Sequence, residues 1–195
     1  MALVVLPSPI IWPGDILGTV FTGSTVQQNA ILLDAAADRV AMHFRAPKAG
    51  NINKIGFLLG TVTTGETLLA GFQDVDITTG NPDGTFDQSG TVAVADTDDN
   101  LWKEVTTSTT RTVAVDDVVA AVIQYDAFVA GSLNIQGYAP GPRSLFNNST
   151  YLNTNTTGSY AKSAATYPIM SIGYDDGTYA FIPGAFPYTA RTATT

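Results

Sequence analysis

The chain has 195 residues, of which 45% are hydrophobic and 13% are charged, and this composition excludes bulk disorder, which requires low hydrophobicity and high charge. Nine Lys and Arg residues against seventeen Asp and Glu residues give a formal net charge of -8; this argues against nucleic acid as a partner, because phosphates need a basic face. No apolar run reaches the roughly 18 residues of a membrane-spanning helix, and the absence of cysteine excludes disulfides and thiolate metal sites.

Residues 1–36 are predicted to form an extended N-terminal arm. The opening MALVVLPSPIIWPG is apolar, and Pro7, Pro9 and Pro13 interrupt it within seven residues. One short helix is predicted at 29–38, where NAILLDAAAD is rich in Ala and Leu. The arm is thus expected to lie outside a domain that occupies residues 37–182.

The domain reads as a series of short strands without intervening helices. Segments rich in Val, Ile, Thr, Phe and Tyr alternate with turns rich in Gly, Pro, Asn and Asp. The predicted strands are 39–45, 51–59, 67–77, 91–95, 101–107, 111–115, 118–125, 132–136, 169–174 and 178–182. Close spacing without helices favours an all-β fold. We predict a single antiparallel β-sandwich of jelly-roll type, with a long polar loop at about 140–166 and an aromatic C-terminal tail at 183–195.

Alternation within the strands predicts which side chains form the core. In 39–45, Val40, Met42 and Phe44 point to one face and His43 to the other. The predicted core consists of Val40, Met42, Phe44, Ile55, Phe57, Leu69, Phe72, Leu101, Trp102, Val119 and Ile123.

Residues for catalysis are scarce. His43 is the single histidine, it is predicted to face solvent, and no Gly-x-Ser-x-Gly motif accompanies it. We therefore expect no enzymatic activity, no catalytic residue and no cofactor.

Acidic clusters leave two interpretations open. Asp74 with Asp76, the run 96–100, and Asp175 with Asp176 could supply oxygen ligands to Ca²⁺, or could cap turns through Asx geometry. EF-hand spacing is absent, so turns are favoured and no metal site is expected.

Aromatic residues are concentrated towards the C-terminal end. Asp175-Asp176-Gly177 between two apolar runs predicts a β-hairpin. Both ends of the chain are apolar and carry prolines, so we expect them to dock on neighbouring proteins. The predicted docking residues are Val4, Val5, Ile10, Ile11, Trp12, Tyr179, Phe181, Phe186 and Tyr188.

The central part of the sequence has a family resemblance. The segments ADRVAMHFRAPKAGNINKIGFLLG, GFQDVDITTGNPDGTF, LWKEVTT, AVDDVVAAVIQY and GSLNIQGY, within 37–139, resemble the β-sandwich domains of bacteriophage virion proteins and related adhesin-like modules. The matching residues are Gly80, Pro82, Gly84 and Trp102, while 115–118 has Asp where the family usually has Gly. The resemblance implies a sandwich fold and transfers no catalytic residue.

This resemblance implies a non-enzymatic structural protein of a phage particle, assembled in the host cytoplasm and resident in the virion. We expect a head decoration or cement protein that stabilises the capsid. Its expected partners are other virion proteins, above all the major capsid protein, and further copies of itself as a homotrimer; neither nucleic acid nor membrane is expected. The alternative is a tail or fibre module that binds host-surface carbohydrate.

Overall fold

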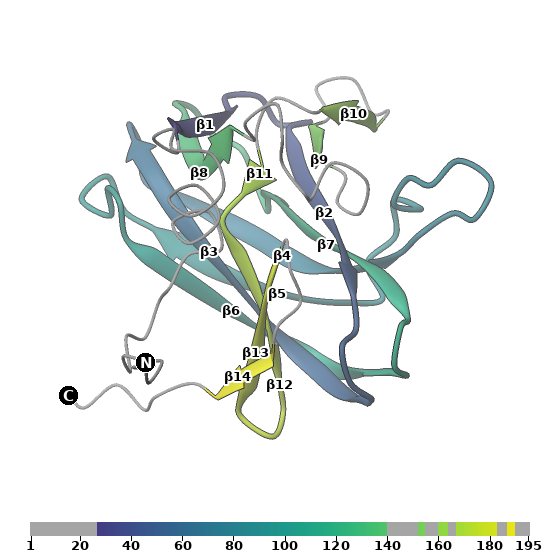
Figure 1. Ribbon diagram of the computed structural model, residues 1–195. Helices are drawn as coiled ribbons and strands as arrows, with labels where there is room; N and C mark the ends of the chain where they lie inside the picture. Colours follow the sequence, from purple (N-terminus) through teal and green to yellow (C-terminus); the bar gives the residue numbers. More distant parts are fainter. Residues whose placement is uncertain (1–26, 140–151, 155–159, 164–166, 183–186, 190–195) are drawn as a thin grey trace, which may run out of the picture.

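The computed structural model describes residues 27–139, 152–154, 160–163, 167–182 and 187–189, and these residues form strands and connecting turns (Figure 1). The strands are β1 (Gln27–Leu33), β2 (Arg39–Arg45), β3 (Gly50–Val62), β4 (Glu66–Asp74), β5 (Gln88–Val94), β6 (Trp102–Val113), β7 (Val118–Tyr125), β8 (Leu133–Ala139), β9 (Leu152–Thr154), β10 (Ala161–Ser163), β11 (Tyr167–Pro168), β12 (Met170–Tyr174), β13 (Thr178–Ile182) and β14 (Pro187–Thr189). Within these ranges no helix could span a membrane.

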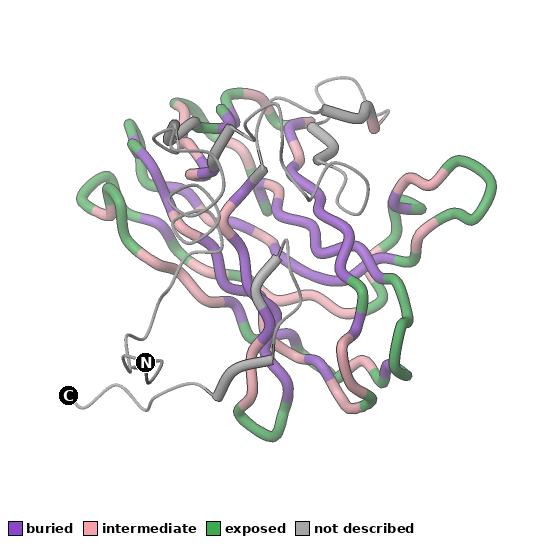
Figure 2. Tube along the Cα trace, in the orientation of Figure 1, coloured by how far each residue is buried: buried purple, intermediate pink, exposed green. Residues whose placement is uncertain are grey.

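Two antiparallel sheets pack face to face, which confirms the predicted all-β sandwich. The first sheet has the order β1-β8-β3-β12-β13-β14, with β6 also paired to β3 and β11 to β8. The second has the order β10-β9-β2-β7-β4-β5. In Figure 2, buried residues (purple) run through the middle of both sheets, and exposed residues (green) mark the connecting turns.

Residues 27–139 form one long antiparallel hairpin that is rolled into the two sheets. Its two arms pair from the outside inwards: β1 with β8, β2 with β7, β3 with β6, and β4 with β5. Among the strand pairs, the outermost register position is Gln27↔Ala139 and the innermost is Phe72↔Gln88. The tip of this hairpin is therefore the loop at 75–87, which projects at the right of Figures 1 and 2.

A segment from much later in the sequence completes the first sheet. β8 pairs with β3 only at Leu59↔Ile135 and Val62↔Leu133, and β12 pairs with the rest of the same β3 edge. Ile169, just before β12, bonds to both β8 and β3. Its N–H donates to the carbonyl of Gln136 in β8 (2.9 Å), and its carbonyl accepts from the N–H of Leu58 in β3 (3.1 Å). We call residues 167–174 the C-terminal wedge.

The hairpin predicted from Asp175-Asp176-Gly177 is confirmed. It joins β12 to β13, and Gly177 has φ of 82°, in the left-handed region that favours glycine. β13 in turn pairs with β14. The wedge and its hairpin are thus part of the sheet.

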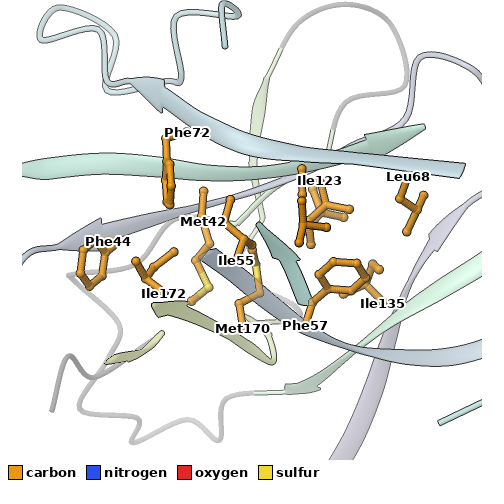
Figure 3. Packing of buried hydrophobic residues seen from close by; sticks show 14 of the residues in the cluster. Met42, Phe44, Ile55, Phe57, Leu68, Phe72, Ile123, Ile135, Met170 and Ile172 are labelled. Atoms are coloured by element: carbon orange, nitrogen blue, oxygen red, sulfur yellow. The ribbon is translucent and has the colours of Figure 1, made fainter. Parts of the chain in front are cut away.

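The core between the sheets combines side chains from the rolled hairpin and the wedge. Met42 and Phe44 of β2, Ile55 and Phe57 of β3, and Met170 and Ile172 of β12 lie close together in Figure 3. Most predicted core residues are buried: Val40, Met42, Phe44, Ile55, Phe57, Phe72, Val119 and Ile123.

Three core predictions were wrong. Leu69 is half-buried because β4 directs Leu68 and Phe72 inwards, which places the odd-numbered Leu69 on the other face. Leu101 precedes β6 and is 47% exposed. Trp102 is half-buried and lies against Gly56 on the outer face of the first sheet, where a methyl group on Gly56 would sit 2.3 Å from the indole ring.

The predicted helix at 29–38 was also wrong. β1 pairs with β8 along its whole length, and a turn follows in which the Asp38 carboxylate accepts the N–H groups of Asp34 (2.8 Å) and Ala35 (2.9 Å). Pairing with β8 outweighs the helix propensity of Ala and Leu. The first sheet therefore includes residues 27–33, ahead of the predicted domain start at residue 37, and the segment predicted as a polar loop contains β9 and β10.

Candidate functional site

The tip loop, residues 75–87, is closed by hydrogen bonds within itself. The Asp76 carboxylate accepts the N–H groups of Thr78 (2.7 Å) and Thr79 (3.0 Å) in an Asx turn. The Asp76 N–H donates to the carbonyl of Asn81 (2.8 Å), and the Gly80 N–H donates to the carbonyl of Asp76 (2.7 Å). These amide bonds to the carboxylate, first from Thr79 and then from Thr78, lower the pKa of Asp76.

Side chains from the sheets fix the base of the tip loop. Arg111 of β6 forms ion pairs with both Asp74 and Asp87, which flank the loop. The fully buried Gln73 accepts the N–H of Gly84 on its side-chain oxygen (3.1 Å). The tip loop is therefore stabilised both by its own hydrogen bonds and by contacts with the sheets at its base. Ile77, at its end, is 97% exposed.

The other acidic clusters also hold turns or form ion pairs. Asp98 accepts the N–H of Ala95 (2.7 Å), and its bond to Lys103 is the main cause of its lowered pKa. Asp99 accepts the N–H of Val62 (2.7 Å). Over the described side chains, no group of three His, Cys, Asp or Glu residues is placed to hold a metal ion.

The turn of the β12–β13 hairpin is also held by carboxylates that accept hydrogen bonds. Asp176 contacts Lys48 and accepts both the N–H (3.0 Å) and the hydroxyl (2.7 Å) of Thr178. The Lys48 bond, followed by the Thr178 bonds, lowers the pKa of Asp176 to about 2. Asp175 accepts from the Asn51 side chain at 2.9 Å, so the hairpin turn is tied to the start of β3.

His43 is buried, so the prediction that it faces solvent was wrong. Only 6% of the residue is exposed. It lies on the outer face of the second sheet, in register with Ala120 and through it with Gln73. This face is covered, because Val75, Phe86 and Tyr160 pack on the small cluster formed by Ala41, Ala120 and Val122. Alternation correctly separated His43 from Met42 but could not show that both faces of β2 are buried.

The outer face of the first sheet carries a second polar cluster. The Lys54 amine lies 3.1 Å from the Tyr179 hydroxyl and 3.1 Å from a Glu104 carboxylate oxygen. These two bonds raise the pKa of Lys54, with Tyr179 contributing most. Tyr179 lies against Gly173, where an added methyl group would be 2.9 Å from the ring. The rings of Trp102, over Gly56, and Tyr179, over Gly173, thus lie on the same outer face of this sheet.

Of the nine predicted docking residues, Tyr179 is the one whose side chain is described, and it is half-buried on β13. Phe181 and Tyr188 occupy β13 and β14, but only their backbone is described. The residues Val4, Val5, Ile10, Ile11, Trp12 and Phe186 lie outside the described ranges. Docking by the two ends of the chain stays a prediction.

The chain matches no protein-family model and shows no significant sequence similarity to a curated protein. The Asx turn favoured for the acidic pair Asp74 and Asp76 is present at Asp76, but the predicted strand 67–77 ends early: β4 stops at Asp74, and Ile77 lies exposed in the tip loop. The Asp76-x-Thr78 spacing, typical of an Asx turn, was the available signal that the strand ends before Ile77.

Proposed function

We propose that the protein is a non-enzymatic structural component of a phage particle, a head decoration or cement protein that binds the major capsid protein as a homotrimer. The observation that carries this proposal is that Asp side chains stabilise turns by accepting hydrogen bonds from the backbone. Asp38, Asp76, Asp98 and Asp117 each accept backbone N–H groups in turns. An acid-rich chain whose described carboxylates stiffen turns suits a protein that must stay folded outside a cell.

The fold supports the same proposal at a finer level, and we propose that the sandwich is a jelly roll. The strand orders β1-β8-β3 with β6 on β3, and β2-β7-β4-β5, are those expected when one long hairpin is rolled into two Greek keys. Jelly rolls are common in viral capsid proteins. The resemblance of 37–139 to phage virion domains points in the same direction.

Adding the protein back to deficient particles tests the proposal. Particles are produced with its reading frame interrupted, mixed with purified protein, and sedimented. We expect saturable co-sedimentation in whole trimers and a higher temperature of DNA release from the decorated particles. Absence of binding, or binding without any change in that temperature, would contradict a cement role.

One observation favours the alternative, a module that binds host-surface carbohydrate. Trp102 and Tyr179 lie on glycines of one sheet face, with the Lys54–Glu104 pair between them. Aromatic rings beside polar groups are suited to stacking against sugar rings. A glycan array probed with the wild type and with Lys54→Met tests this: selective binding that Lys54→Met abolishes would favour the alternative over the cement role.

A further inference from the structure

We propose that the tip loop is a preformed docking knob, and that Ile77 inserts into an apolar pocket with a basic rim on a different protein of the particle. This inference rests on the proposed function, because it names the surface through which the assembly would occur. The tip loop is a site separate in the sequence from the two predicted docking ends.

The first argument is the position of Ile77. The loop projects beyond both sheets, as Figure 2 shows, and Ile77 is the most exposed of the large hydrophobic side chains in the described residues, at 97%. A single exposed apolar side chain is common on protein surfaces. Here, however, the chain holds that side chain at the far end of a structured loop.

The second argument is preorganisation. Beyond the Asx turn of Asp76, a β-bridge joins Val75 to Pro82, and the Asp83 N–H donates to the carbonyl of Asp74 (2.9 Å). The Arg111 ion pairs then clamp the base. Because the loop is already ordered, a partner would not have to immobilise it, and less of the binding free energy would be lost to ordering.

The third argument is charge, which identifies the kind of partner. Residues 74–87 contain four Asp and no Lys or Arg. Arg111 contacts Asp74 and Asp87, whereas Asp76 and Asp83 are exposed and have no ion pair among the described side chains. A pocket that receives Ile77 therefore needs cationic or N–H donor groups around its rim.

A second copy of the chain does not supply that rim from its described residues. Five of the six Lys and Arg residues whose side chains are described form ion pairs within their own chain: Arg45 with Asp116, Lys48 with Asp176, Lys54 with Glu104, Lys103 with Asp98, and Arg111 with Asp74 and Asp87. Burial raises the pKa of the Tyr160 hydroxyl, and the sixth residue, Arg39, acts against this larger effect by favouring the charged form of that hydroxyl. We therefore take a different and more basic protein as the partner, and a second copy of the chain is one of the outcomes that the experiment below distinguishes.

The experiment uses particles lacking the protein and three full-length variants. Ile77→Ser removes the apolar side chain from a site where it supports nothing in the fold. Val129→Ser is the matched control, because Val129 is 81% exposed on another loop. Asp76→Ala keeps Ile77 but removes the carboxylate that orders the loop. Thermal unfolding of each purified variant verifies that the sandwich is intact.

We expect Ile77→Ser to weaken binding to the particles by about 10- to 100-fold, the effect of losing one buried Ile side chain. Val129→Ser should bind like the wild type, and Asp76→Ala should fall between them. Added salt should weaken wild-type binding.

Three results would overturn the inference. If the wild type binds and Ile77→Ser binds equally well, the knob is refuted while the proposed function stands. If Ile77→Ser instead abolishes self-association of the free protein, the partner is a second copy. If the wild type fails to bind, the proposed function and the knob fall together.

Discussion

The C-terminal wedge provides the sharpest test of the fold, because the same substitution can be made at a buried and at an exposed isoleucine. Ile172 of β12 is 0% exposed within the core, whereas Ile77 is 97% exposed. Ile172→Ala removes buried apolar atoms and leaves a cavity, so it should lower the free energy of unfolding by about 2–5 kcal/mol. Ile77→Ala should change it by less than about 0.5 kcal/mol.

Urea denaturation followed by circular dichroism measures both values. For a chain of this length, the loss at Ile172 corresponds to a fall in Tm of roughly 4–20 °C. The transition should stay single and its slope unchanged, because the wedge belongs to the same core as the rolled hairpin. If the two variants lose equal stability, or if Ile172→Ala produces a separate early transition, the wedge is not integrated in the sandwich.

Three further predictions concern two turns and one strand position. Asp116 has φ of 69°, so Asp116→Gly should keep or raise stability in thermal melts, whereas Asp116→Val should cost about 1–2 kcal/mol. Gly71→Ala should destabilise by about 1–3 kcal/mol, because the new methyl group would lie 2.2 Å from the Gln88 carbonyl and 2.6 Å from Phe86; a neutral result would refute that packing. The lowered pKa of Asp176 means that its stabilising contacts are complete above the ordinary value of 3.8 and are lost as the pH falls towards about 2. Asp176→Asn should therefore flatten the acid denaturation curve in that window, and NMR titration of Lys48→Met should show the Asp176 midpoint moving up.

Local chemistry made much of the sandwich predictable. Alternation in β2 correctly assigned Val40, Met42 and Phe44 to the core, and the Asp-Gly pair at Asp176 correctly located a hairpin. Both signals act between residues close together in the sequence. Within the acidic clusters, Asp76, Asp98 and Asp176 cap turns through equally local contacts. Asp74, Asp99 and Asp175 instead bond to residues that are distant in the sequence, which the local pattern could not show.

Long-range pairing explains the errors. Nothing within 29–38 shows that β8, about a hundred residues later, pairs with β1 and converts an Ala-rich and Leu-rich segment into a strand. The outer face of the second sheet, on which His43 lies, is covered in part by Phe86 and Tyr160, which come from different connections. The candidate site was missed for a related reason: the exposure of Ile77 follows from where the rolled hairpin places its tip.

The wedge also has a consequence for synthesis on the ribosome. The β3 edge from Ile52 to Phe57 receives its β12 partner only after residues 170–174 have been translated. Until then the nascent chain exposes unpaired N–H and C=O groups, a template for pairing with other chains. Slow translation beyond residue 139 would prolong that interval, so insoluble product should increase when rare codons are placed in 140–166 and not when they are placed in 1–26, before β3 has been made.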